Sequence, residues 1–172
     1  MKMIRMTDKY ILFYKEWPSN FRRTDFVYSF DGREPKRFFC TEQAFMYCKA
    51  MFFHDEETAK MILDAPTPMD AKNLGRRVRN YVDSEWDKVR YGYMRDVNLE
   101  RFRQDEVLRK LILNPEYDGL EFVEASPVDL IWGVGIEKDD PLIDDDRNWK
   151  GRNLLGKALT EVRKIIKGEC SR

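Results

Sequence analysis

The sequence predicts a helix-rich α+β fold with a small β-sheet. Three observations predict this class: short aromatic runs near the N-terminus are typical of strands, helical periodicity fills the middle of the chain, and one more apolar run precedes an amphipathic final helix. The chain has 172 residues and no low-complexity stretch or Pro/Gly/Ser-rich linker, and at this length it can bury roughly two thirds of its unfolded surface. We therefore expect a single domain over residues 1–172.

The N-terminal quarter is expected to be mostly β. Residues 10–14 (YILFY) form an apolar, aromatic-rich run. Residues 26–30 lead through the dipeptide Asp31-Gly32 toward residues 37–40, as in a hairpin with a DG turn. These segments are predicted to form short strands.

Helical spacing begins at Thr41, which has the residue type of an N-cap. The helices are expected at residues 41–53, 55–63, 69–77, 84–102, 107–113 and 153–166. Pro66 and Pro68 separate the second helix from the third. A strand is expected at residues 120–125, and the many turn formers of residues 126–150 predict a loop.

The charge balance excludes some classes of function. Lys+Arg and Asp+Glu both number 31, so the formal net charge of zero argues against an extended basic face for nucleic acid, and any such contact should be local. Nothing approaches the roughly 18 consecutive apolar residues of a membrane span, and the first residues do not lead into a signal-peptide core. We expect a cytoplasmic protein without membrane contact.

The chain has three cysteines and one histidine, which fit neither a secreted disulfide framework nor a structural zinc site. A catalytic Cys–His couple would need His54 with Cys40 or Cys48, and no sequence context supports it. The thiols are therefore expected to pack, and we expect no bound metal and no cofactor.

A carboxylate and an amine share one apolar stripe of the helix expected at residues 41–53. Glu42 and Lys49 are about two helical turns apart, so they project within about 20° of one another, with Met46 between them. The rise of about 10 Å is too long for an i,i+4 ion pair and suits two groups that approach a ligand from two sides. The alternative is structural: Glu42 complements the helix dipole and Lys49 extends its amine to solvent.

A second pattern follows the strand expected at residues 120–125. Asp129 shortly precedes Trp132, and Gly133 and Gly135 come after it. Such a loop presents an aromatic face to a base or sugar, while the glycines allow close approach of the backbone. A buried Trp beside a turn explains the pattern equally well.

Three further segments favour anion binding only weakly. Residues 149–153 (WKGRN) open the final helix, where free N–H groups favour a phosphate, although charges are common at helix entrances. Residues 19–21 (SNF) form a polar turn after Pro18. Residues 75–77 (GRR) place cations near a helix end, which C-capping also explains.

Together these segments resemble the NADAR family, also called YbiA-like. Residues 19–21 resemble its SNF motif, and residues 41–49 resemble its T/S-E-x(6)-K helix. The other motifs follow in order, namely Ala71 with Gly75-Arg76 (A-x(3)-G-R), the helix from Trp86 (W-x(2)-V), residues 123–135 (V-E-x(4)-D-x(2)-W-G-x-G) and residues 151–156 (G-x-N-x-L-G). The resemblance covers about residues 13–163 and implies a YbiA-like fold.

The resemblance also implies an N-glycosidase. One branch of the family hydrolyses phosphoribosylamino-pyrimidine intermediates of riboflavin synthesis, and another removes ADP-ribose from modified guanine in nucleic acid. Both reactions cleave a ribose C1–N bond. We expect an ADP-ribosyl glycohydrolase, with the riboflavin-intermediate reaction as the alternative. A module that binds NAD or ADP-ribose without turnover is a further alternative, whereas a purely structural protein leaves the charged pair unexplained.

The resemblance assigns roles to particular residues. The expected catalytic residues are Glu42, Lys49 and Asp129, and the expected substrate-binding residues are Ser19, Asn20, Phe21, Arg76, Trp132, Gly133 and Asn153. The expected partner is an ADP-ribose-type or phosphoribosyl small molecule, or ADP-ribosylated guanine in DNA. Residues 137–147 (EKDDPLIDDDR) are longer and more acidic than the short Gly-rich link expected in the YbiA branch of the family, so we expect them to form a lid or to alter substrate choice.

Overall fold

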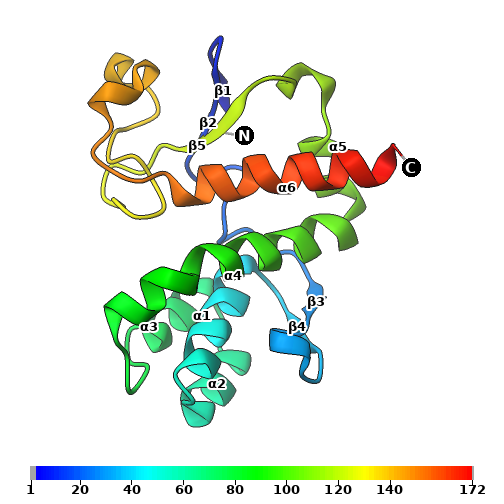
Figure 1. Cartoon of the computed structure of the whole chain (residues 1–172), viewed down its shortest axis with the longest axis vertical. Helices are drawn as coiled ribbons and strands as arrows, with labels where there is room; N and C mark the ends of the chain where they lie inside the picture. The colour runs from blue at the N-terminus through cyan, green and yellow to red at the C-terminus, as the bar shows by residue number, and fades with distance from the viewer. Residues whose placement is uncertain (1–2, 172) are drawn as a thin grey trace. The chain divides into compact units, whose positions relative to one another are not determined.

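The computed structural model describes residues 3–171 and contains two compact units (Figure 1). The terminal unit consists of the described parts of residues 1–19 and 106–172, and the central unit consists of residues 20–105. Both contain helices and short strands, so the predicted α+β class is confirmed. The prediction of a single domain over residues 1–172 stays a prediction.

The terminal unit is built on a three-stranded sheet in the order β1-β2-β5. β1 (Arg5–Met6) pairs antiparallel with β2 (Tyr10–Phe13), and β2 pairs parallel with β5 (Glu121–Glu124). All four residues of β2 are buried, as expected for the continuous apolar run of a strand covered on both faces. The parallel pairing requires a long crossover, which the chain between β2 and β5 supplies.

Helix α6 (Leu154–Cys170) packs along β5 in the terminal unit (Figure 1). Leu155, Leu159, Val162 and Ile166 recur at helical spacing and are fully or almost fully buried. This is the apolar stripe that the sequence predicted, although the helix continues to Cys170 instead of ending near residue 166. The other helix of this unit is α5 (Glu106–Ile112), close to its predicted range.

The central unit is mostly helical. Its helices are α1 (Thr41–Phe52), α2 (Glu56–Leu63), α3 (Pro68–Gly75) and α4 (Asp83–Gln104), and its hairpin is formed by β3 (Phe26–Tyr28) and β4 (Lys36–Phe38). Helix α1 contacts α2, α3 and α4 and is buried around most of its surface, since only Lys49 and Phe52 are more than slightly exposed. The helix that carries Glu42 and Lys49 is therefore at the centre of this unit.

The predicted N-cap of α1 was wrong by one residue. The cap is Cys40, whose Sγ accepts a hydrogen bond from the Gln43 N–H at 3.4 Å. Thr41 is the first helical residue, and its hydroxyl donates to the Oδ1 of Asn98 on α4 at 3.2 Å. The Thr41 side chain thus links two helices instead of capping one.

The segment at residues 126–150, predicted to be a loop, contains two 3-10 turns, Pro141–Asp144 and Asp146–Asn148. Ile143 is fully buried and belongs to a core cluster with residues of β2 and β5. Arg5 pairs with Asp144 at 2.7 Å, and Lys138 pairs with Glu16 at 2.5 Å. These two ion pairs and the buried Ile143 favour a fixed position of residues 137–147 over the movement that a lid requires.

None of the helices within residues 3–171 has both the length and the apolar character that a membrane span needs.

Candidate active site

Glu42 lies in the first turn of α1 and is 6% exposed. Its backbone N–H donates to the Asn20 carbonyl at 3.1 Å, which ties Asn20 to the start of the helix. A carboxylate at a helix N-terminus is favoured by the helix dipole. The structure therefore buries the Glu42 side chain at a helix end that supports its negative charge.

A buried polar network fixes the start of α1. Asn20 donates from Nδ2 to the Met94 Sδ at 3.4 Å, and Asn98 donates from Nδ2 to the Met94 carbonyl at 3.0 Å. Arg101 donates from NH1 to the Thr41 hydroxyl at 3.3 Å. Burial lowers the pKa of Arg101 to about 10, which leaves it charged at neutral pH. We infer that Asn20 positions Glu42, and a substrate contact by Asn20 stays a prediction.

Lys49 extends its amine to the last turn of α3. Nζ donates to the Gly75 carbonyl at 2.9 Å and lies 4.2 Å from the centroid of the Tyr81 ring. Burial, and after it the positive charge of Arg90, lowers the pKa of the Lys49 amine. An amine with a lowered pKa is a common feature of catalytic lysines.

Three residues beside Lys49 were missed at the sequence level. Tyr81 donates from its hydroxyl to the Asp83 Oδ1 at 2.6 Å, and Arg90 NH2 lies 2.8 Å from the same oxygen. The Arg90 side chain is only 5% exposed. Arg90 lies one helical turn after Trp86 and one turn before Met94, and both of these residues are buried. The sequence could therefore have indicated that Arg90 lies on the buried face of α4.

The glycine of the A-x(3)-G-R motif allows two helices to approach closely. A Cβ placed on Gly75 would lie 2.0 Å from the Met46 Sδ of α1. Ala71, one turn earlier on α3, is fully buried. The same approach brings the Gly75 carbonyl to the Lys49 amine, so the motif serves both packing and the site.

Two of the predicted substrate-binding residues lie at the surface of the central unit. Arg76 is the exposed C-cap residue of α3, and its NH1 donates to the Asn73 Oδ1 at 3.3 Å. Phe21 is half-buried, and the Lys72 Nζ lies 5.3 Å from its ring centroid. Both are accessible to a ligand, and their binding roles stay predictions.

Asp129 organises the loop after β5 in the terminal unit. Its Oδ1 accepts from the backbone N–H groups of Ile131 at 2.9 Å and Trp132 at 2.8 Å. The Ser126 hydroxyl accepts from the Asp129 N–H at 3.1 Å. These contacts give Asp129 a structural task, so its catalytic role, like the stacking role of the half-buried Trp132, stays a prediction.

Gly133 and Asn153 hold the same loop against the start of α6. A Cβ on Gly133 would lie 2.8 Å from the Ser126 Cβ, and the Gly133 carbonyl accepts from the Asn153 N–H at 3.1 Å. The Asn153 side chain accepts from the Glu124 N–H at 3.0 Å and donates to the Phe122 carbonyl at 3.1 Å. Asn153 is 2% exposed and bonded to the backbone, and its predicted substrate contact stays a prediction.

Ser19 is buried in the terminal unit, where its N–H donates to the Glu16 carbonyl at 3.0 Å. Two residues earlier in the chain, Trp17 stacks on Tyr117 with ring centroids 6.4 Å apart. The predicted residues therefore form two groups. The central unit contains Glu42, Lys49, Asn20, Phe21 and Arg76. The terminal unit contains Asp129, Trp132, Gly133, Asn153 and Ser19.

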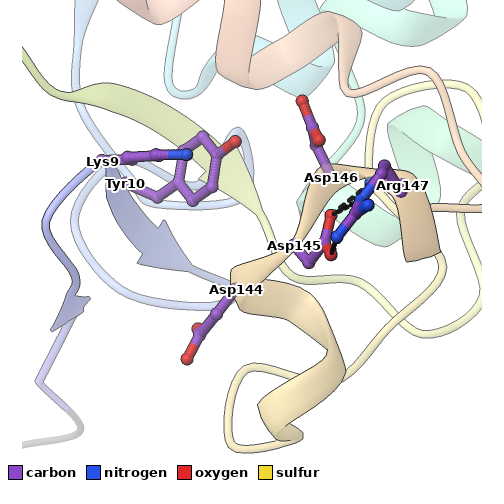
Figure 2. A pocket seen from close by; sticks show the side chains of 6 residues that line it. All are labelled: Lys9, Tyr10, Asp144, Asp145, Asp146 and Arg147. Carbon is purple, nitrogen blue, oxygen red and sulfur yellow. Dashed lines mark hydrogen bonds and ion pairs between the residues drawn. The ribbon is translucent and has the colours of Figure 1, made fainter.

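The acidic segment forms part of a surface pocket of about 380 Å³ (Figure 2). Its lining residues are Lys9, Tyr10, Asp144, Asp145, Asp146 and Arg147. Figure 2 shows Arg147 paired with Asp145, whose pKa that contact lowers to about 2. Three carboxylates against two cations disfavour a phosphate-bearing ligand here.

A second pocket, of about 500 Å³, lies beside α3 in the central unit. Met61, Ala65, Pro66 and Leu74 provide its apolar lining. Neither pocket is lined by Glu42 or Lys49. Among residues 3–171, no group of three or more His, Cys, Asp or Glu side chains is placed to hold a metal ion.

Comparison with known proteins places the chain in a family. The family model described as NADAR domain matches residues 5–167. Protein irg-1 of Caenorhabditis elegans is 35% identical over 173 residues, which span 93% of this chain and 81% of that protein. N-glycosidase R617 of Acanthamoeba polyphaga mimivirus is 34% identical over 170 residues, which span 91% of this chain and 96% of that protein.

A solved structure agrees with these relatives. The NMR structure of the E. coli protein YbiA matches with a TM-score of 0.73 at 27% identity, and the match covers 99% of this chain and 92% of that one. The α+β architecture is thus shared with a solved structure. The chain belongs to the NADAR domain family, which confirms the resemblance drawn from its motifs.

Proposed function

We propose that this NADAR protein hydrolyses the C–N bond between a ribose and a base, and that its substrate carries an ADP-ribosyl group. Hydrolysis of an N-glycosidic bond is the general part of this function, because family relatives named N-glycosidase include R617 and the YbiA proteins. The ADP-ribosyl group is the specific part. The observation that carries the proposal is the buried Glu42 carboxylate on the same helix as the half-buried Lys49 amine.

The reaction accounts for the need for a carboxylate. As the C1–N bond breaks, positive charge develops on C1 and the ring oxygen of the ribose, and a fixed carboxylate in a poorly solvated site stabilises that charge. Glu42 is such a group, and the same oxygen atoms accept a proton from the attacking water. In this mechanism water adds at C1 and the base departs with a proton.

Lys49 supports a second chemical route. When the ribose ring opens, C1 is held as an iminium carbon bonded to the base nitrogen. The neutral Lys49 amine adds to C1, the base departs with a proton from that amine, and an imine between C1 and Lys49 remains. Water then hydrolyses this imine, which releases the ribose aldehyde and restores the amine. The lowered pKa of Lys49 supports this role, because only the neutral amine is a nucleophile. The alternative is electrostatic: a protonated Lys49 pairs with a phosphate of the substrate.

Charge on the central unit supports a phosphate-bearing substrate. Arg76 and Arg77 are exposed at the end of α3, the helix whose Gly75 carbonyl contacts Lys49. The whole chain is neutral, which favours a small molecule or a single modified nucleotide over a long nucleic acid. The riboflavin-pathway phosphoribosylamino-pyrimidine stays the alternative substrate, because it shares the ribosyl C–N bond and a phosphate.

A chromatographic assay with two substrates tests the proposal. The wild type is incubated with ADP-ribosylated guanine in DNA and, in parallel, with a phosphoribosylamino-pyrimidine. Release of ADP-ribose from the DNA is the expected result. Release from the pyrimidine alone would replace the proposed substrate, and binding of ADP-ribose without release from either would favour a binding module.

A further inference from the structure

The groups around the Lys49 amine come from a short loop and from α4. Tyr81 lies in the loop before α4, and its ring centroid is 4.2 Å from the Lys49 Nζ. Asp83 and Arg90 lie on α4, one near its start and one two turns later, and are joined at 2.8 Å. Asp83 also accepts from the Tyr81 hydroxyl at 2.6 Å, so one carboxylate holds both neighbours of the amine.

The contacts of Lys49 suit a neutral amine as well as a charged one. A neutral amine has two N–H groups and one lone pair. Gly75 offers a carbonyl at 2.9 Å and Tyr81 offers the face of its ring, so both N–H groups have an acceptor. The lone pair is then left for an electrophile, whereas in the ammonium form a third proton takes its place.

Charges of both signs act on this amine. Arg90 opposes the ammonium form, while Asp83 and Glu42 support it. Arg90 is the buried member of its ion pair, with a side chain 5% exposed against 74% for Asp83. Water screens the charge of Asp83 more than that of Arg90, which makes the guanidinium the stronger influence. Burial of the amine acts in the same direction as Arg90.

We propose that Tyr81, Asp83 and Arg90 form a positioning device that directs the Lys49 amine and keeps it unprotonated enough to react. Tyr81 and the Gly75 carbonyl fix its direction. The charge of Arg90 favours the neutral amine over the ammonium form, and Asp83 holds Arg90 and Tyr81 in place. The inference rests on the proposed function in that Lys49 is taken as a reacting amine. None of the three residues is assigned a contact with substrate.

The groups that face Lys49 come from every element around it. Helix α1 itself contributes Glu42, α4 contributes Asp83 and Arg90, the loop contributes the Tyr81 ring, and α3 contributes the Gly75 carbonyl. Asp87, on α4, pairs with the Arg90 Nε at 3.1 Å and helps to hold the guanidinium. Opposite changes in protonation are therefore expected when Arg90 or Asp83 loses its charge.

The test measures the protonation of Lys49 without any substrate. The full chain is labelled with trace acetic anhydride between about pH 6 and pH 11, and the acetylation rate of the Lys49 peptide is followed by mass spectrometry. Arg90→Gln is expected to move the midpoint of the rate curve to higher pH, and Asp83→Asn to lower pH. A shift of one pKa unit changes the labelling rate below the midpoint by about tenfold. A merely structural role would not move the two variants in opposite directions.

Arg103→Gln is the matched control. It removes a cation of α4 that also pairs with a carboxylate, Glu100 at 2.7 Å, but it lies more than three turns beyond Arg90. The control should leave the rate curve of Lys49 at its wild-type midpoint. Arg90→Lys keeps the positive charge, so its midpoint should lie closer to wild type than that of Arg90→Gln. If Arg90→Gln fails to fold, Asp83→Asn still decides, because the Asp83 side chain is mostly exposed.

The labelling result is separate from turnover. Equal midpoints for wild type, Arg90→Gln and Asp83→Asn would overturn the positioning device, whatever the enzyme activity. Opposite shifts would support it even if neither ribosyl substrate is cleaved. In that case the proposed function would be wrong, while the positioning of Lys49 by these residues would still be supported.

Discussion

At the residue scale, the side-chain amide of Asn98 links α4 to the start of α1, the helix that carries Glu42. It donates to the Met94 carbonyl at 3.0 Å and accepts from the Thr41 hydroxyl at 3.2 Å, with Asn20 beside it. Asn98 is fully buried, so water does not compete for these contacts. The position of the Glu42 carboxylate thus depends on buried residues at the start of α1 and on α4.

Replacement of Asn98 by Ala should therefore destabilise the protein. The change leaves buried partners unsatisfied, which costs about 1–3 kcal/mol of unfolding free energy. Urea unfolding measures this loss. Asn73→Ala, at an exposed position of α3, is the control and should change the free energy by less than about 0.5 kcal/mol. Equal effects for the two variants would contradict the network.

The same residue shows the limit of prediction from sequence. The SNF motif predicted that Asn20 contacts substrate, and that role stays a prediction. Its partner Asn98 lies on α4, far along the chain. The sequence of a helix does not indicate which distant residue a polar side chain will bond to. Tyr81, Asp83 and Arg90 were missed for the same reason, because their link to Lys49 exists only in the fold.

At the element scale, the approach of α3 to α1 depends on Gly75. Gly75→Ala should destabilise the protein by about 1–3 kcal/mol, because its Cβ would lie 2.0 Å from the Met46 Sδ and force the helices apart. Thermal or urea unfolding measures the change. The shift should also lengthen the contact between Lys49 and the Gly75 carbonyl.

Gly92→Ala is the matched control for Gly75→Ala. Gly92 lies inside α4, and a Cβ there would meet nothing within 4 Å. Alanine is the better helix former by about 1 kcal/mol, so this variant should be more stable than wild type. A loss of stability for Gly92→Ala, or none for Gly75→Ala, would refute the packing argument.

Helices were predicted better than strand pairing or loops. Apolar spacing located α1, α2, α4 and α6 to within a few residues, since periodicity reflects which face is buried. The parallel pairing of β2 with β5 was not predicted, because pairing across so long a connection leaves no local signal. The turns of the acidic segment were missed because their anchors, Arg5 and Glu16, are distant in sequence.

At the scale of the whole molecule, the buried carboxylate of Asp55 couples stability to pH. Asp55 caps α2 and bonds to Arg79, whose guanidinium Nη lies 2.7 Å from its Oδ1. Hydrogen bonds from Arg79 hold the pKa of Asp55 well below its ordinary range. Because the folded pKa lies below the unfolded value of about 3.9, this stabilisation is present above that pH and is lost as the pH falls below it.

Asp55→Asn should therefore flatten the acid side of the stability curve. Unfolding free energies between about pH 2 and pH 6 measure the effect. Arg79→Gln should flatten the curve in a similar way, because it removes the largest cause of the lowered pKa. An Asp55→Asn variant that keeps the full acid dependence of the wild type would show that other carboxylates dominate.

The most direct test of the central claim is the single-turnover release of ADP-ribose from an ADP-ribosylated guanine nucleotide by Glu42→Gln, with binding measured separately. Glu85→Gln, which removes an exposed carboxylate of α4, is the control. We predict that Glu42→Gln binds the nucleotide as the wild type does but releases ADP-ribose at least about 100-fold more slowly, while Glu85→Gln is unaffected. Release by Glu42→Gln at the wild-type rate would contradict the assignment of catalysis to the carboxylate of α1.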